Sequence, residues 1–373
     1  MKKTAILAAL LTVVSASAFA QESAGTNITG KEYPKINPDR TVIFKVDAPT
    51  AESVAVNLGG RHEMTKNSDG QWEVTTPPIV PGFHYYQLIV DGTAMPDPGT
   101  VSFFGAGRWG SGIEIPSEDM DFWQVKDVPQ GSIVEKYYWS KTTESMRHCY
   151  VYLPHEYDLN PTKKYPVLYL QHGNAENEYG WAVQGHTAQI MDNLIAEKKA
   201  VPMIVVMPNG VYFNNAAPGA DINMFQPTMK NSRSDSTKEI EDSFPDIIKF
   251  IDSHYRTEKG RGKRAVAGLS MGGRQSCALS MAHPDTFGYV GMFSGVVIPD
   301  ETTEAALSKY LGSSPELYWI GVGNKDGVKN NTDKMRAFCD EKGYRYEYYE
   351  SEGGHTWRNW RVYLTIFAQK LFK

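Results

Sequence analysis

The chain has 373 residues, 41% of them hydrophobic, and a formal net charge of −5 at pH 7. This length predicts two domains, and the acidic balance argues against nucleic acid as a partner. Three cysteines, Cys149, Cys277 and Cys339, are too few for a disulfide framework. The sequence has no Cys/His cluster with zinc spacing and no phosphate-binding Gly-x-x-x-x-Gly-Lys motif, so we expect neither a metal nor a cofactor.

The first 20 residues are typical of a secretory signal peptide. Lys2 and Lys3 form a basic start, residues 5–14 form an apolar run, and Ala18-Phe19-Ala20 is a small-residue cleavage site. The apolar run is too short to span a membrane, and no cysteine that could carry a lipid anchor follows the cut. We therefore expect cleavage after Ala20, no membrane anchor, and a secreted or periplasmic protein.

Residues 21–120 contain short strand patterns and no helical stretch. The strand signals lie at 41–46, 53–58, 71–74 and 84–90, and Asp-Gly pairs provide turn residues between them. This pattern predicts a small all-β, immunoglobulin-like sandwich. Residues 121–131 are acidic and polar around Pro129-Gln130-Gly131, which predicts a linker.

From residue 132 to residue 373, strand and helix patterns alternate. Such alternation predicts an α/β domain with a mostly parallel sheet and helices on both faces. Strand signals lie at 165–171, 263–267, 317–323 and 344–349, and apolar residues recur at helical spacing over 239–255. The stretch 212–237 is long, polar and turn-rich, which fits either disorder or a lid or binding loop at the edge of an active site; we favour the loop.

The segment Gly268-Leu269-Ser270-Met271-Gly272 lies between the strand at 263–267 and a helical stretch at 274–282. In a nucleophile elbow, a serine occupies a sharp strand-to-helix turn and glycines on either side allow the turn. Alone, this short motif also fits a glycine-rich strand–helix junction. The strand before it and the helix after it favour the elbow, with Ser270 as the nucleophile.

A serine nucleophile needs a base, and in the α/β-hydrolase order the base is a histidine that follows the serine and the acid. His283 and His355 are the histidines after Ser270. His283 ends the elbow helix, which points away from the nucleophile. His355 lies in a loop after the strand at 344–349, so we choose His355 as the base.

The acid of the triad should follow the strand that comes before the strand at 344–349. Asp326 lies in the loop after the strand at 317–323, and we choose it. Its rivals are Asp333, on the surface of a predicted helix, and Asp300, which follows an earlier strand.

An oxyanion hole needs two preorganised backbone donors. One is the amide of Met271, the residue after the nucleophile. The other should come from the loop after the strand at 165–171, and there we choose the amide of Asn174. His172 in the same loop is either a base or a structural histidine that shapes the loop, and we favour the structural role.

With these residues placed, the region from about residue 131 to the C-terminus resembles carbohydrate esterase family 1, in the esterase D-like branch of the α/β-hydrolases. The motifs that carry the resemblance are Tyr150-Val151-Tyr152-Leu153-Pro154, Leu168-Tyr169-Leu170-Gln171-His172-Gly173, Gly268-Leu269-Ser270-Met271-Gly272-Gly273 and Gly353-Gly354-His355. The family includes feruloyl, acetylxylan and siderophore esterases. The resemblance implies the roles given above to Ser270, Asp326 and His355 and to the amides of Asn174 and Met271. Many relatives have an apolar residue where this chain has Asn174, a change that a backbone donor tolerates.

The N-terminal region resembles the family 48 carbohydrate-binding module. The matching segments are Asp69-Gly70-Gln71-Trp72, Pro81-Gly82-Phe83-His84-Tyr85-Tyr86 and Val90-Asp91-Gly92. They are mostly turn and core residues, so they imply the fold more than sugar binding. Phe103, Phe104 and Trp109 lie in a glycine-rich loop, where they either stack on a sugar or aromatic acid or pack between the domains.

These features predict a secreted feruloyl esterase that releases ferulic acid from feruloylated plant-wall arabinoxylan. Trp181, Phe225 and Trp357 are candidate walls of the pocket for the aromatic acyl group. An acetylxylan esterase would share every catalytic residue, and an enterobactin-type siderophore esterase is a third candidate. A non-catalytic glycan-binding protein is the alternative of another class, and the intact serine, aspartate and histidine set argues against it. The acyl group and the oligomeric state stay open at this point.

Overall fold

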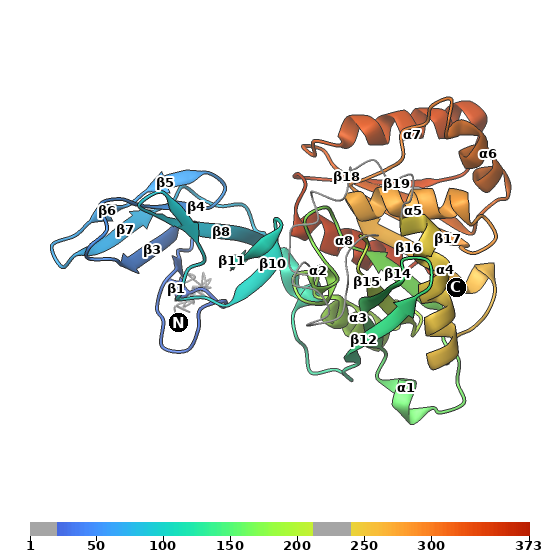
Figure 1. The fold of residues 1–373 in the computed structure, drawn as a ribbon, viewed down its shortest axis with the longest axis horizontal. Coiled ribbons are helices and arrows are strands. Elements are labelled where there is room, and N and C mark those ends of the chain that lie inside the picture. Colours follow the sequence, from blue (N-terminus) through green and yellow to red (C-terminus); the bar gives the residue numbers. More distant parts are fainter. Residues whose placement is uncertain (1–20, 212–239) are drawn as a thin grey trace, which may run out of the picture.

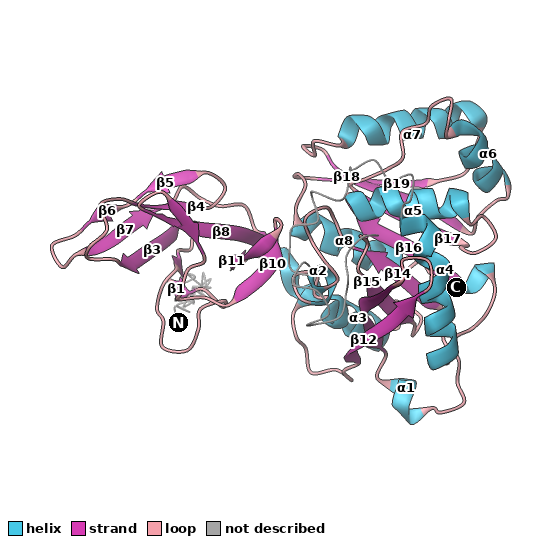
Figure 2. Ribbon diagram, viewed as in Figure 1, coloured by secondary structure: helices cyan, strands magenta, loops and turns pink. Residues whose placement is uncertain are grey.

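A computed structural model of the chain describes residues 21–211 and 240–373. Figure 1 shows two lobes side by side, an all-β lobe built from the N-terminal residues and a larger lobe of strands and helices. Figure 2 shows that the helices are confined to the second lobe and to the connection that leads into it. Among the described residues, no helix combines the length and the apolar character needed to cross a membrane.

The N-terminal lobe is a sandwich of two sheets with the strand orders β1-β2-β3-β7-β6 and β10-β11-β8-β4-β5, and β9 pairs with β8. Apolar residues of both sheets, such as Phe44 and Leu88, share one core. Trp72 is buried in this core, in agreement with the interpretation of its segment as turn and core residues. The strands of the first sheet are β1 (Glu22–Ser23), β2 (Lys35–Ile36), β3 (Val42–Asp47), β6 (Thr65–Lys66) and β7 (Gln71–Thr75). Those of the second are β4 (Val54–Asn57), β5 (Arg61–Glu63), β8 (Gly82–Val90), β9 (Thr93–Met95), β10 (Ser102–Gly105) and β11 (Arg108–Ile115).

The second lobe is built on an eight-stranded sheet with the order β12-β13-β15-β14-β16-β17-β18-β19. β12, β13 and β15 pair in antiparallel fashion, and the strands from β15 to β19 are parallel. The strands are β12 (Ser132–Ser140), β13 (Ser145–Leu153), β14 (Val167–Gln171), β15 (Ile204–Pro208), β16 (Arg264–Leu269), β17 (Tyr289–Phe293), β18 (Leu317–Gly323) and β19 (Glu347–Ser351).

Helices cover both faces of this sheet, because successive residues of its buried strands point in opposite directions. In β14, Val167 and Tyr169 contribute to one core, whereas Leu168 and Leu170 contribute to the other. The helices are α1 (Glu156–Leu159), α2 (Tyr179–Ala182), α3 (Thr187–Ala196), α4 (Ile240–His254), α5 (Met271–Ala282), α6 (Glu304–Gly312), α7 (Lys329–Lys342) and α8 (Trp357–Ala368), with the short 3-10 turns η1 (Glu118–Trp123) and η4 (Arg261–Lys263). α4 to α7 pack on the first core and α3 and α8 on the second, which is the predicted α/β-hydrolase architecture.

The connection between the lobes is more ordered than its polar composition suggested. Trp123, at the end of η1, is buried in the second core of the α/β lobe. The Asn193 side chain of α3 donates hydrogen bonds to the carbonyls of Phe122 and Gln124. The first part of the expected linker therefore packs on the α/β lobe, because one large aromatic side chain outweighs the acidic residues around it.

A buried ion pair joins the two lobes. Arg361 of α8 has a fully buried side chain, and both of its terminal nitrogens donate to the Glu114 carboxylate of β11, at 2.8 and 2.9 Å. Its Nε donates to the carbonyl of Gln184, and its guanidinium lies 4.7 Å from the ring centroid of Trp123. A desolvated guanidinium depends on such partners, so this contact fixes the lobes against each other.

Replacing Glu114→Ala would leave the buried guanidinium of Arg361 without its carboxylate. We expect the free energy of unfolding, measured in urea, to fall by about 3–5 kcal/mol. The control is Glu63→Ala, which removes the exposed partner of Arg61 and should change the free energy by no more than about 1 kcal/mol. Equal small losses in both variants would contradict the importance of the buried pair.

Candidate active site

Ser270 occupies a strained turn between β16 and α5. Its φ and ψ angles are 53° and −113°, a combination that is costly for a residue with a side chain. The amide of Ser270 donates to the carbonyl of Phe293, 2.7 Å away at the end of β17. Helix α5 begins at the next residue, Met271, so the free N–H groups and the positive end of the helix dipole lie beside the serine.

The glycines of the elbow are needed because backbone approaches backbone there. A Cβ on Gly268 would lie 2.7 Å from the Gln171 carbonyl oxygen, and one on Gly272 would lie 2.5 Å from the same atom. Real side chains do not fit at such distances, so the elbow packs directly on the end of β14. A Cβ on Gly173 would lie 3.5 Å from the Cβ of Ser270, so the loop after β14 runs beside the candidate nucleophile.

Asp326 and His355 form a direct pair. The Nδ1 atom of His355 lies 3.0 and 3.1 Å from the two carboxylate oxygens of Asp326, and the Val328 amide donates to the same carboxylate at 3.0 Å. The Asp326 side chain is fully buried, whereas that of His355 is 35% exposed. Burial raises the pKa of Asp326, but the hydrogen bonds from His355 and Val328 outweigh it and hold the pKa below its usual value. The carboxylate is therefore ionised at neutral pH and orients the imidazole, whose Nε2 remains for proton transfer.

The three candidates come from one edge of the sheet. Ser270 follows β16, Asp326 follows β18 and His355 follows β19, and these strands are parallel. The carboxyl ends of parallel strands are where α/β proteins place their ligands. The structure thus brings Asp326 and His355 into hydrogen-bond contact and places Ser270 on the same edge.

The rivals considered from the sequence have other partners. Asp333 lies on α7 and pairs with Lys329 and Arg336. Asp300 accepts hydrogen bonds from the amides of the turn that follows it. The Nε2 atom of His283 lies 2.8 Å from the carbonyl of Glu241. These hydrogen bonds and ion pairs account for Asp333, Asp300 and His283 as structural residues.

The loop after β14 carries the proposed second oxyanion donor. Asn174 is exposed there, and in the described part of the chain neither its amide nor that of Met271 donates a hydrogen bond. His172 is structural, as predicted: its Nε2 accepts from the amide of Gly210 and its Nδ1–H donates to the carbonyl of Gly173, both at 2.8 Å. Burial lowers the pKa of His172, which fits a neutral ring with both nitrogens in use.

Two of the three aromatic residues expected to line an acyl pocket, Trp181 and Trp357, are buried. Trp181 is 1% exposed and donates through Nε1 to the carbonyl of Gln171, and Trp357 is 3% exposed and packs on Trp181. Both therefore belong to the core, and the prediction that they are pocket walls does not fit their burial. Phe225 lies outside the described residues.

The aromatic residues of the N-terminal glycine-rich loop pack between the lobes. The Phe103 ring lies 4.9 Å from that of Phe83, and Phe104 is buried. Trp109, which is 39% exposed, contacts the ring of Tyr179 in α2. Of the two alternatives left open for this loop, interdomain packing describes Phe103, which packs against the second core of the α/β lobe, and Trp109, which also keeps an accessible surface. The Phe104 ring packs on Trp109.

Sequence reasoning missed two contacts of the oxyanion loop, the loop between β14 and α2 that carries Asn174. Glu176, two positions after Asn174, is buried and accepts a hydrogen bond from the hydroxyl of Tyr85 in β8 of the sandwich. The amide of Gly107 in the sandwich donates to the carbonyl of Ala175 at 2.8 Å. No sequence signal pointed to this contact, because its partners lie in different lobes.

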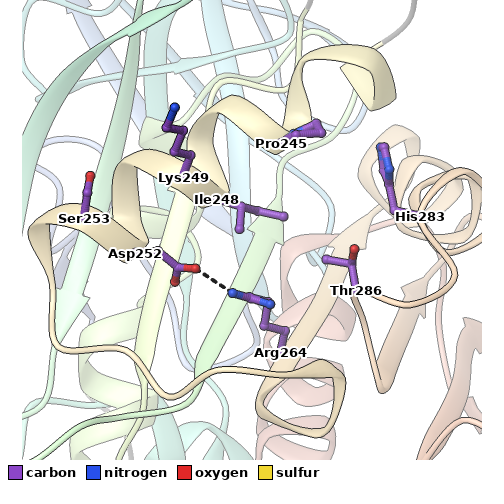
Figure 3. A pocket seen from close by; sticks show the side chains of 8 residues that line it. All are labelled: Pro245, Ile248, Lys249, Asp252, Ser253, Arg264, His283 and Thr286. Atoms are coloured by element: carbon purple, nitrogen blue, oxygen red, sulfur yellow. Dashed lines mark hydrogen bonds and ion pairs between the residues drawn. The ribbon is translucent and has the colours of Figure 1, made fainter.

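Two cavities differ in their distance from the catalytic edge. One of about 500 Å³ is lined by α4 and by Arg264 at the start of β16, where Asp252 pairs with Arg264 (Figure 3). The length of β16 separates it from Ser270 by roughly 20 Å. The other, of about 1250 Å³, lies between the lobes. It is lined by Arg40 and Glu118 and also by residues beside the candidate pair, Lys325 next to Asp326 and Gly354 and Thr356 next to His355.

Comparison with known proteins identifies esterases as the relatives of this chain. Residues 140–370 match the family Esterase, described as "Putative esterase". The chain is 39% identical over 362 residues to an endo-1,4-beta-xylanase/feruloyl esterase of Xylanibacter ruminicola, which covers 93% of this chain and 47% of that protein. The chain thus spans about half the length of this curated relative.

Solved structures share the fold. A CE1 ferulic acid esterase of the anaerobic fungus Anaeromyces mucronatus is 26% identical, with a TM-score of 0.56 over 69% of this chain and 96% of that one. The enterobactin esterase of Shigella flexneri is 16% identical, with a TM-score of 0.61 over 89% of this chain and 93% of that one. The second match covers most of both lobes, so the two-lobed fold is itself found in a known protein.

Replacing Asp326→Asn should leave the fold intact and remove the charge that orients His355. We expect kcat for 4-nitrophenyl acetate to fall by about 10³–10⁴-fold, as when the acid of a serine triad is neutralised. Asp333→Asn, in which a surface carboxylate of α7 is neutralised, should retain full activity. Equal activity in both variants would remove Asp326 from the candidate site.

Glu176 should make stability depend on pH in a defined window. Burial raises its pKa to about 8, against the lowering effect of the Tyr85 and Trp357 hydrogen bonds. The folded protein therefore keeps a proton that the unfolded chain releases near its ordinary value of about 4.3, and this contribution to stability is lost as pH rises from there through 8.

The variant Glu176→Gln carries no titratable group at this position. Its thermal midpoint, measured from pH 5 to pH 9, should therefore fall less with rising pH than that of the wild type. Parallel curves for the two proteins would show that Glu176 does not hold the proton.

Proposed function

Because the chain belongs to the esterase family and is a carboxylic ester hydrolase, we propose that it is a feruloyl esterase that releases ferulic acid from plant cell-wall arabinoxylan. The observation that carries this proposal is the 39% identity, over 93% of the chain, to a protein named for both xylanase and feruloyl esterase activities. The aligned part includes residues of both lobes. The fold shared with a solved CE1 ferulic acid esterase also supports it.

In the proposed mechanism, Oγ of Ser270 attacks the ester carbonyl carbon and its proton passes to Nε2 of His355. Asp326 holds the imidazole in position through Nδ1 and stabilises the imidazolium that forms. The amides of Met271 and Asn174 hold the oxyanion of the tetrahedral intermediate. As the intermediate collapses, the bond from the carbonyl carbon to the sugar oxygen breaks, and His355 gives its proton to that oxygen, which departs as a hydroxyl and leaves feruloyl-Ser270. Water, deprotonated by His355, then attacks the feruloyl-enzyme in the same way and releases ferulate and Ser270.

Two further parts of the proposal concern the setting of the enzyme. The first 20 residues act as a cleaved signal peptide, which would place the protein in the periplasm or outside the cell. The sandwich acts as a module of the family 48 type that holds a polysaccharide near the site. The partly exposed Trp109, beside α2 and the oxyanion loop, offers an aromatic surface for it.

The test is the release of free acids from feruloylated arabinoxylan, followed by chromatography, with Ser270→Ala as the matched control. We expect ferulate from the wild type and none from the variant, because the variant lacks the nucleophile. Acetate without ferulate would reassign the enzyme as an acetylxylan esterase.

If neither acid is released, labelling with a fluorophosphonate probe separates the remaining candidates. A labelled wild type would turn the assignment to other esters, such as those of siderophores. A folded wild type that takes no label would favour a non-catalytic glycan-binding protein.

A further inference from the structure

The hydroxyl of Tyr85 is the centre of a buried network that crosses the boundary between the lobes. It donates to the carboxyl group of Glu176, whose oxygens lie 2.9 and 3.0 Å away. It accepts from Nε2 of Gln184 at 2.8 Å and from Nε1 of Trp357 at 3.3 Å. The tyrosine belongs to the sandwich, as does Phe104, whose carbonyl oxygen lies 3.3 Å from the hydroxyl. Glu176, Gln184 and Trp357 belong to the α/β lobe.

Two of these partners lie beside the proposed catalytic groups. Glu176 is two residues after Asn174, and Trp357 is two residues after His355 and begins α8. One oxygen atom therefore bridges the loop with the proposed oxyanion donor and the segment with the proposed base.

We propose that Tyr85 is a positioning residue for ester hydrolysis, whose hydroxyl links the oxyanion loop to the segment that carries His355. The proposal rests on the roles given to Asn174 and His355 under the proposed function. It assigns the N-terminal sandwich a part in the reaction itself, independent of any sugar that the sandwich binds.

The surroundings of the hydroxyl leave little room for an alternative arrangement. The Gln184 amide that donates to Tyr85 also donates to the carbonyl of Phe104, at 2.6 Å. A Cβ on Gly180 would lie 2.9 Å from a side-chain oxygen of Glu176 and 3.2 Å from the Trp357 ring, so the network is packed closely around this glycine. Burial raises the pKa of Tyr85 well above its usual value, so the hydroxyl keeps its proton.

The sandwich also contacts the oxyanion loop through its backbone. The Gly107 amide donates to the carbonyl of Ala175, the residue directly after Asn174. The loop is thus held at two consecutive residues after Asn174, by Gly107 at Ala175 and by Tyr85 at Glu176. Donors aimed at a developing charge act only when they are preorganised, so a loosened loop should slow the chemical step more than it weakens substrate binding.

The test is Tyr85→Phe, assayed with 4-nitrophenyl acetate so that the result does not depend on the acyl preference. The variant keeps the ring, which packs edge-on against Phe83, and loses only the bridging oxygen. We expect kcat to fall by about tenfold or more with KM changed by less than about twofold, because the loss falls on the transition state.

The matched control is Tyr86→Phe. Tyr86 is the next residue of β8, and its buried hydroxyl bonds to Asp97 at 2.8 Å inside the sandwich, away from the α/β lobe. Both variants lose one buried tyrosine hydroxyl, so both should unfold at a lower temperature, and only Tyr85→Phe should lose kcat. Wild-type kcat in both variants, or a loss that merely follows the unfolded fraction, would overturn the proposal.

A second variant breaks the same link from the other lobe. Glu176→Leu removes the acceptor of the Tyr85 proton and should lower kcat in the same way, which keeps the test decisive should Tyr85→Phe not fold. The double variant should be no slower than the slower single variant, because both changes remove one interaction. A wild type that cleaves 4-nitrophenyl acetate through Ser270 but releases no ferulate would refute the feruloyl assignment and leave this test valid. A wild type without Ser270-dependent turnover would overturn both.

Discussion

The geometry of the candidate site depends on the direct backbone contact between the elbow and the end of β14. In the sheet, Gln171 of β14 pairs with Gly268 of β16, and the absence of side chains at Gly268 and Gly272 lets the elbow close on the Gln171 carbonyl. The strained backbone of Ser270 is held by this packing and by its bond to β17. The position of the nucleophile relative to the oxyanion loop is therefore set by the register of β14 and β16, which the hydrogen bonds of the sheet fix.

A second constraint comes from polar groups that are buried where the lobes meet. Arg361 and Glu176 are both removed from water, and each has its partner in the sandwich, Glu114 for the arginine and Tyr85 for the glutamate. A buried polar group without its partner is costly. Without the sandwich, Arg361 would lose its carboxylate and Glu176 would lose the Tyr85 hydroxyl. The two lobes are therefore joined by polar partners as well as by packing, although each has its own core.

Much of this structure could be predicted because it follows from local patterns. The strand at 317–323 has the bounds expected, and the loop after it holds the aspartate that meets His355. The departures have local causes. β14 begins after Pro166, which has no N–H to give to a neighbouring strand, and Tyr165 forms only an isolated bridge. The residues expected to start the last strand instead close α7, where the Tyr344 amide donates to the carbonyl of Cys339, and β19 begins at Glu347.

Other features could not be predicted, because they depend on packing between distant segments. Trp181 and Trp357 lie close in sequence to catalytic motifs, and nothing in the sequence distinguishes an aromatic ring that lines a pocket from one that is buried beneath it. The contact of Tyr85 with Glu176 joins residues that are 91 positions apart. The sequence gives the chemical type of each residue, and only the docking of the two lobes turns them into a pair.

That docking also separates two ways in which the sandwich can affect catalysis. A tethered sugar-binding module raises the local concentration of a polymer, and its effect disappears with a small soluble ester. A module whose Gly107 and Tyr85 are bonded to the oxyanion loop acts on the rate constant itself, and its effect should be the same for a small ester and for a polysaccharide. Trp109, the residue proposed for sugar binding, contacts Tyr179 of α2, and Gly107, two residues before it, is bonded to the oxyanion loop. The proposed sugar surface and the contact with the catalytic loop therefore come from neighbouring residues of one domain.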